Sequence, residues 1–323
     1  MTDREATIDA PDAPQPELPR QEGPSRRALF TAALGATGIA AGALGLAGTA
    51  DAQTVSDVAI LNFALQLEYL EANYYAFAVT GSAIPASFTS GSTTAGTATG
   101  GRKITFTDPV ISQYAREIAG DELAHVNFLR SAIGTAALGS QPTIDLGTGP
   151  TSAFGLAAQA AGLVSAGTGF DPYASDENFL LGAFLLEDLG VSAYKGATAA
   201  LSSLLYRQVA ASVLGAEAYH AAVIRAALYR KGIATPSLVD ATEAISAARN
   251  RLDGITEADQ GIRATATPQG PASNIVPADG NGIVFGRTAA EVLNVVYLNR
   301  SSVVSGGFFP SGVNGSIKTS AAN

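Results

Sequence analysis

The two histidines of the chain, His125 and His220, each follow a glutamate by three positions, in the segments GDELAHVNF and GAEAYHAAV. Glutamate occupies 13 of the 323 positions, so chance would produce this coincidence on the order of once in several hundred trials. A carboxylate and an imidazole three residues apart lie on one face of a helix. Both groups are ligands for iron, manganese and zinc, so the spacing is typical of a metal site.

Apolar residues at helical spacing surround both pairs. One stripe contains Ile111, Ala115, Ile118, Glu122, His125 and Leu129, and the other contains Val213, Glu217, His220, Ile224 and Leu228. A Glu–His hydrogen bond on a helix surface would have polar neighbours instead. An ionised carboxylate in an apolar interior is strongly disfavoured unless it is paired, protonated or bound to metal. The stripes therefore predict that both pairs face a core and share one metal centre.

Two other segments supply acidic residues for the same centre. In FLLEDLGVSAYKG, Glu187 lies on the apolar face, whereas Asp188 is turned by about 100° from it. In LQLEYLEANYY, helical periodicity does not distinguish between Glu68 and Glu71 as the inward carboxylate. Each segment is thus expected to add one carboxylate.

A repeated spacing favours Glu68 over Glu71. Glu68 precedes Tyr75 by seven residues, as Glu187 precedes Tyr194, and this indicates an internally duplicated helix pair. Glu71 then remains an alternate or outer ligand. The two tyrosines are expected either to donate hydrogen bonds to the ligands or a bound oxidant, or to be ordinary aromatic core residues.

The composition excludes several classes of protein. A net charge of −9 disfavours nucleic acid as a partner. With no cysteine, the chain has no disulfide, iron–sulfur cluster, thiolate zinc site or catalytic thiol. The only methionine is Met1, so a mature chain has none to ligate haem. No glycine-rich phosphate-binding motif stands between a strand pattern and a helix pattern.

Residues 1–52 are interpreted as an export signal after a Pro-rich, disordered lead. The segment SRRALF at 25–30 has twin arginines, a Gly/Ala-rich apolar run follows, and ADA at 50–52 suits signal peptidase. This resembles a twin-arginine signal and predicts export to the periplasm or cell envelope. A permanent membrane anchor is disfavoured because the run is rich in Gly and Thr, so no stable membrane span is expected in the mature protein.

The remaining sequence predicts an all-α fold. Helices are expected at 55–79, 109–134, 176–201, from shortly after 201 to 232, 237–254 and 287–299. The short link between the third and fourth helices makes them antiparallel neighbours, while the long segment 134–170 is expected to cross the bundle. The sequence therefore predicts a four-helix bundle at 53–232 and a helical and irregular C-terminal extension at 233–323, packed on the bundle. No chemistry is assigned to the extension.

Taken together, these motifs strongly resemble the ferritin-like superfamily. Its di-iron and di-manganese members use one Glu from each of two helices and Glu-x-x-His from each of two others. In this chain those positions are Glu68, Glu122, His125, Glu187, Glu217 and His220, in the family's order. The resemblance implies that Glu122 and Glu217 bridge two metal ions while Glu68 and Glu187 are terminal ligands. Four carboxylates balance two divalent cations, and the mixed nitrogen and oxygen set suits Fe or Mn.

Three segments, 61–75, 121–130 and 280–299, are similar more narrowly to exported ferritin-like proteins related to plant desiccation-related proteins. The resemblance implies an exported di-iron or di-manganese protein that reacts with O2 or hydrogen peroxide, as a ferroxidase, a peroxidase or a manganese-catalase-like oxidoreductase. The alternative is a non-catalytic protein, protective in desiccation or other stress, whose metal site stabilises the fold. Whether the chain is an enzyme and whether it forms a homo-oligomer stay open at this stage.

Overall fold

The computed structural model describes residues 55–135, 137–254 and 259–323. The predicted export signal at 1–52 lies outside these residues. Helices dominate the described part, and the prediction of an all-α fold is confirmed. None of these helices combines the length and the apolar character needed to cross a membrane.

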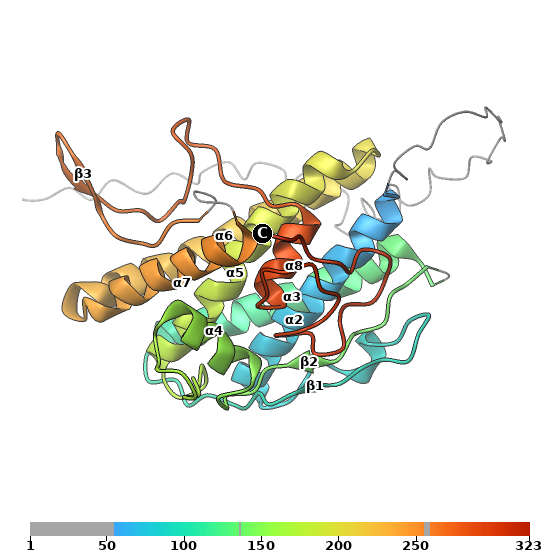
Figure 1. Ribbon diagram of the computed structural model, residues 1–323, viewed down its shortest axis with the longest axis horizontal. Coiled ribbons are helices and arrows are strands. Elements are labelled where there is room, and N and C mark those ends of the chain that lie inside the picture. The colour runs from blue at the N-terminus through green and yellow to red at the C-terminus, as the bar shows by residue number, and fades with distance from the viewer. Residues whose placement is uncertain (1–54, 136, 255–258) are drawn as a thin grey trace, which may run out of the picture. The chain divides into compact units, whose positions relative to one another are not determined.

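Four long helices form the bundle (Figure 1): α2 (Asp57–Thr80), α3 (Pro109–Ile133), α5 (Asp176–Ala200) and α6 (Leu204–Ala234). Helix α2 packs along α3, and α5 packs along α6. The two pairs meet mainly through α2 and α5, whereas α3 and α6 contact each other sparsely. The bundle thus has a closely packed α2/α5 side and a looser α3/α6 side.

Side-chain caps begin all four helices. A side chain at each N-terminus accepts a hydrogen bond from a backbone N–H of the first turn, namely Ser56, Asp108, Ser175 and Ser203. Asp57 also accepts hydrogen bonds from the backbone N–H groups of Ser202 and Ser203, each at 2.8 Å. These bonds fix the start of α2 against the short link between α5 and α6.

The connection between α3 and α5 is long, as predicted, and contains ordered structure of its own. The short strand β2 (Ile144–Asp145) pairs in parallel with β1 (Ala98–Thr99), which precedes α3. Within this connection, the apolar segment AFGLAAQAA forms the helix α4 (Ala153–Ala161). The connection between α3 and α5 is therefore an ordered segment whose apolar residues join the hydrophobic core, rather than a free loop.

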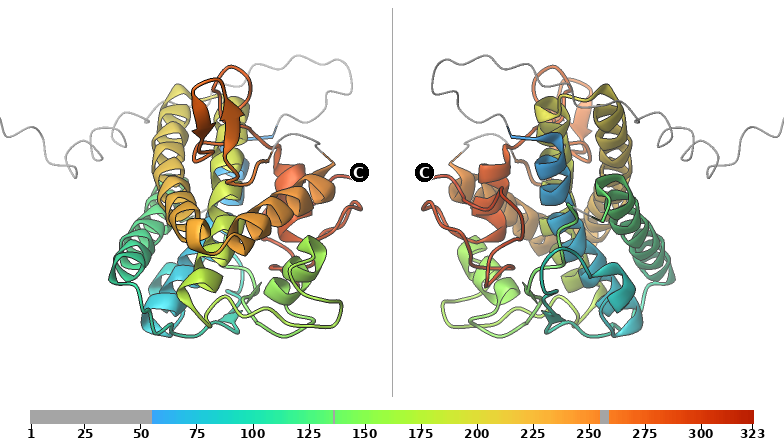
Figure 2. Two further views of the ribbon diagram at one scale, coloured as in Figure 1. Left: turned by 90° about the vertical axis from the view of Figure 1, so that its left-hand side faces the viewer. Right: turned by 90° about the vertical axis from the view of Figure 1, so that its right-hand side faces the viewer.

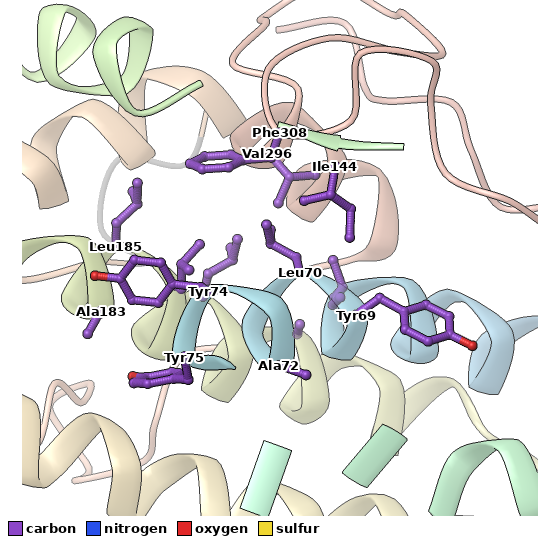
Figure 3. Packing of buried hydrophobic residues seen from close by; sticks show 14 of the residues in the cluster. Tyr69, Leu70, Ala72, Tyr74, Tyr75, Ile144, Ala183, Leu185, Val296 and Phe308 are labelled. Carbon is purple, nitrogen blue, oxygen red and sulfur yellow. The ribbon is translucent and has the colours of Figure 1, made fainter. Parts of the chain in front are cut away.

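Helix α2 is buried on both of its faces. In Figure 3, Leu70 lies on the side of Ile144, Val296 and Phe308, while Tyr75 points to the opposite side. The crossover and the C-terminal extension therefore cover the face of α2 that the other bundle helices leave free. This explains why almost the whole length of α2 is buried.

The C-terminal extension contains α7 (Ser237–Asp253), the antiparallel strands β3 (Thr265–Thr267) and β4 (Gly270–Ala272), and α8 (Ala289–Val296). Figure 2 shows these elements from two further sides. Helix α8 begins with a capping box in which Thr288 and Glu291 each bond the other's backbone N–H. The segment predicted as a helix at 287–299 is therefore helical over eight residues.

Buried arginines join this extension to α5 and α6. Arg249 of α7 donates hydrogen bonds to Asp188 of α5 at 3.0 Å and to both carboxylate oxygens of Asp259 at 2.6 Å. Arg225 of α6 donates to the same Asp188 oxygen at 2.7 Å. Asp188 points away from the face of α5 that carries Glu187 and into a second buried site, which the helical period alone did not reveal.

A third buried arginine, Arg287, comes from the segment before α8. It donates hydrogen bonds to Asp253 at 2.7 Å, to Asp259 at 2.9 Å and to the hydroxyl of Ser192 on α5 at 2.9 Å. Three guanidinium groups therefore balance three carboxylates in this network. Buried charges are tolerated when they are paired and hydrogen-bonded in this way.

Candidate metal centre

The six predicted ligands come together inside the bundle. Helix α2 supplies Glu68, α3 supplies Glu122 and His125, α5 supplies Glu187, and α6 supplies Glu217 and His220. All four carboxylates are fully buried. The imidazoles are partly exposed, with side-chain exposures of 13% for His125 and 6% for His220.

These side chains form two groups that share two members. In one group, ligand atoms of Glu68, Glu122, His125 and Glu217 all lie within 4.8 Å of one another, and in the other those of Glu122, Glu187, Glu217 and His220 do so. Glu122 and Glu217 belong to both groups. This arrangement suits two neighbouring cations, each with one imidazole and one carboxylate of its own.

Both imidazoles point Nδ1 at the carboxylates. His125 Nδ1 lies 3.3 Å from Glu68 Oε2 and 3.5 Å from Glu217 Oε1. His220 Nδ1 lies 3.0 Å from Glu122 Oε1 and 3.5 Å from Glu187 Oε2. Nδ1 is therefore the atom of each histidine that is placed to bind a metal ion together with these carboxylates.

The buried ligand atoms fit a pair of bound cations. Both carboxylate oxygens of Glu122 and of Glu217 are buried without a hydrogen-bond partner, as is one oxygen each of Glu68 and Glu187 and the Nδ1 atom of each histidine. Unpaired buried carboxylates are strongly unfavourable, and cations would satisfy them. Two free oxygens on Glu122 and Glu217 suit bridging, while one free oxygen on Glu68 and Glu187 suits terminal binding.

The second oxygens of the two terminal carboxylates are held by the predicted tyrosines. The Tyr75 hydroxyl on α2 donates a short hydrogen bond to Glu187 Oε1, and the Tyr194 hydroxyl on α5 donates one to Glu68 Oε1. Each tyrosine thus supports the carboxylate of the other helix rather than that of its own. These bonds orient the free oxygens toward the centre.

Without a cation, the carboxylates and imidazoles shift each other's protonation. Burial, followed by the charges of Glu122 and Glu68, raises the pKa of Glu217 well above its ordinary value. Burial also raises the pKa of Glu68 to about 7, even though His125 lowers it. Burial would lower the pKa of both imidazoles, but the neighbouring carboxylates raise those of His125 and His220 to about 12. The metal-free centre therefore holds protons that a cation must displace.

Metal affinity is accordingly expected to rise with pH. Below about pH 7 Glu68 carries a proton, and burial with the neighbouring carboxylates raises the pKa of Glu217 well above its ordinary value. Below about pH 12 His125 and His220 are imidazolium ions, so metal binding releases protons. Affinity should rise about tenfold per pH unit for each proton displaced. Equilibrium dialysis with Mn(II) across pH 7, combined with proton release into weak buffer, measures this dependence. An affinity that does not change with pH would contradict the expectation.

Asp121 supports one of the two imidazoles. Its Oδ2 atom lies 3.2 Å from His220 Nε2, on the side of the ring away from the ligand cluster. Sequence reasoning did not identify Asp121. Asp121 directly precedes Glu122 in the sequence, but its side chain reaches His220 on α6 rather than the ligands of its own helix α3.

A missing side chain at Gly190 makes room for the centre. A Cβ atom on Gly190 would lie 2.3 Å from Glu217 Oε2 and 3.2 Å from Glu71 Oε1. Glu71 is buried beside the centre but belongs to neither ligand group. Gly190 follows Glu187 by three residues, as Glu71 follows Glu68, so the two positions correspond in the internal repeat. That correspondence is the signal from which Gly190 could have been found.

Gly190→Ala is expected to weaken metal binding about 10- to 100-fold without unfolding the helix, because the new methyl group displaces a shared carboxylate. Metal content after dialysis, measured by elemental analysis, tests this. Gly120→Ala is the matched control, since a Cβ on Gly120 of α3 meets nothing within 4 Å. That change should leave metal content unaltered and stabilise the helix by about 0.5–1 kcal/mol. Equal metal content in the two variants would refute the role of Gly190.

Comparison with known proteins places the chain in a family. The family model described as a ferritin-like domain matches residues 56–230. A protein named ferritin-like catalase from Nesocodon mauritianus is 28% identical over 276 residues, covering 81% of this chain and 85% of that protein. A desiccation-related protein from Craterostigma plantagineum is 30% identical over 254 residues, covering 74% and 76% respectively. No solved structure matches the chain. The chain belongs to the ferritin-like domain family.

Proposed function

We propose that the chain is an exported di-iron or di-manganese protein that decomposes hydrogen peroxide to oxygen and water. The observation that carries the proposal is the pair of ligand groups sharing Glu122 and Glu217, with free carboxylate and imidazole atoms turned toward one another. The similarity to a protein named ferritin-like catalase favours peroxide as the substrate. Export is proposed from the twin-arginine segment at 25–30 alone.

The reaction converts two molecules of hydrogen peroxide into one O2 and two waters. One peroxide molecule loses two electrons and two protons and becomes O2. The O–O bond of the other breaks, and it takes up two electrons and two protons to form two waters. The cluster of Glu68, Glu122, His125, Glu187, Glu217 and His220 would hold a pair of redox-active Fe or Mn ions, and such a pair would supply and store the two electrons, so no external reductant would be consumed.

Residues of the chain handle the protons and the orientation of the ligands. Burial, followed by the charge of Glu217, raises the pKa of Glu71 well above its ordinary value, so its carboxyl group can hold a proton beside the shared carboxylate. Tyr75 and Tyr194 keep Glu187 and Glu68 in fixed orientations. Such positioned acids and hydrogen-bond donors assist proton transfer to and from a small substrate.

The α3/α6 side is the proposed entrance to the centre. Among the six ligands, only His125 and His220 have exposed side-chain surface, and both come from this side. Helices α3 and α6 also contact each other sparsely. The limited exposure favours substrates of a few atoms, such as peroxide or O2.

Oxygen evolution from hydrogen peroxide without any reductant tests the proposal. The full chain loaded with Mn(II), and separately with Fe(II), should evolve one O2 for every two peroxide molecules, and Glu217→Gln should lose this activity because a shared ligand is removed. Equal rates with and without bound metal would refute the proposal. Consumption of O2 with Fe(II), without evolution from peroxide, would assign the centre to a ferroxidase instead.

A protective role is the second candidate, favoured by the similarity to a desiccation-related protein over about three-quarters of the chain. In that case the metal pair holds four helices together and no redox turnover is required. Chelation would then lower the melting temperature strongly, and the loaded protein would evolve no O2. The two measurements together separate the candidates.

A further inference from the structure

We infer that the two metal positions are unequal, and that the position served by His220 binds its cation more tightly than the position served by His125. The inference rests on the metal centre of the proposed function but not on turnover. The inference is based on one difference between the two halves of the internal repeat, and this difference lies in a residue next to the ligands rather than in the ligands themselves. Asp121 supports His220, and no corresponding acid supports His125.

The ligands themselves follow the repeat closely. In both helix pairs a Glu precedes a Tyr by seven residues and a Glu precedes a His by three. The tyrosine bonds are reciprocal, and each imidazole directs Nδ1 at a carboxylate of its own helix or of a neighbouring one. The ligands alone would therefore make two nearly equivalent positions.

Asp121 positions the imidazole of His220. Nδ1 of His220 lies 3.0 Å from Glu122 Oε1, while Nε2 on the opposite edge lies 3.2 Å from Asp121 Oδ2. When Asp121 accepts a hydrogen bond from Nε2–H, the proton stays on Nε2 and the lone pair of Nδ1 faces the centre. A carboxylate behind a ligating histidine also makes that histidine a stronger donor.

His125 has no such support. The repeat places Ala216, directly before Glu217, at the position that corresponds to Asp121, and alanine has no acceptor. Within the described part of the chain, Nε2 of His125 has no hydrogen-bond partner. Its side chain is 13% exposed against 6% for His220. The ring of His125 is therefore less constrained and closer to solvent.

Partners behind metal ligands typically contribute about 10- to 100-fold to metal affinity. We therefore expect the full chain to bind Mn(II) in two steps whose dissociation constants differ by about 10- to 100-fold. The first equivalent should fill the position of His220. Electron paramagnetic resonance distinguishes the steps, because a single Mn(II) ion gives an isolated six-line signal whereas a pair shows spin coupling.

Three variants test the assignment. Asp121→Ala should weaken the first step about 10- to 100-fold and bring the two steps together, while Glu117→Ala, which removes another exposed acid from α3, should change neither. Ala216→Asp should strengthen the second step by supplying His125 with a partner. The melting temperature of each metal-free variant reports whether the fold is retained.

Either of two results would overturn the inference. One is a spin-coupled signal at the first equivalent of Mn(II) in the unaltered chain, which means that the ions bind as a pair. The other is an unchanged first step in Asp121→Ala together with an unchanged second step in Ala216→Asp. Two unequal steps in a protein that evolves no O2 would uphold this inference while refuting the proposed function, so the two failures are distinguishable.

Discussion

Glu122→Gln is expected to produce a folded chain that retains neither of the two metal ions proposed for the centre. Glu122 belongs to both ligand groups, and both of its oxygens are buried without a hydrogen-bond partner. The amide keeps the shape of the side chain but loses the charge and one oxygen, so each position loses a ligand at the same time. Burial opposes ionisation of Glu122, but interactions with the imidazolium rings of His125 and His220 lower its pKa to about 2, so the ionised group stabilises the metal-free fold at neutral pH. The amide loses these interactions, and the metal-free variant should therefore melt lower than the metal-free wild type while remaining folded.

The terminal carboxylates provide the comparison. Glu68 and Glu187 each belong to a single group, so Glu68→Gln and Glu187→Gln should each retain about one ion where Glu122→Gln retains none. Elemental analysis of Fe and Mn after exhaustive dialysis gives the number of ions per chain. Two retained ions in Glu122→Gln would show that this carboxylate is not shared, and the centre described above would be wrong.

Arg249→Met should lower the free energy of unfolding by about 3–5 kcal/mol, as expected when one partner of a buried ion pair is removed. Arg249 is fully buried and hydrogen-bonded to Asp188 and Asp259. Its Nη1 atom also donates to the backbone carbonyls of Phe184 and Leu185, just before Glu187 on α5. The variant leaves two buried carboxylates short of a donor and two carbonyls without this bond, and methionine fills the space but restores neither.

Urea denaturation of the metal-free protein measures this loss without interference from bound ions. Arg263→Met is the matched control, since Arg263 pairs with Asp240 in an ion pair whose two side chains are more than half exposed. That control should unfold at the same urea concentration as the wild type, because exposed ion pairs contribute little. If both variants unfolded alike, the network would not be what attaches the extension to the bundle.

Helix boundaries were predictable because their signals are local. Asp108 and the proline after it begin α3, and Gly134 ends it, as the residue types predict. Helix α4 was not predicted as a helix, because its nine residues lie within a segment rich in Gly, Thr and Pro. Short elements of this kind take their stability from packing rather than from their own sequence.

Helical periodicity failed where a helix is buried on more than one face. Helical periodicity correctly predicted that Glu187 and Asp188 point in different directions around the axis of α5. It did not show that the second direction is also interior, where Asp188 binds Arg225 and Arg249. A single apolar stripe indicates one buried face, whereas α5 is enclosed by α6 on one side and by the extension on another.

By itself, the sequence determined the helical fold and the family, and it predicted which six side chains would form a shared metal centre. Periodicity and the Glu-x-x-His spacing act within one helix, where the backbone alone decides which residues share a face. Only the tertiary structure decided what crosses between helices: the exchange of tyrosine hydroxyls, the pairing of Asp121 with His220, the room left by Gly190, and the bond between Arg287 and Ser192, 95 residues apart. Such contacts depend on the distance and rotation of packed helices, and no local spacing in the chain records those quantities.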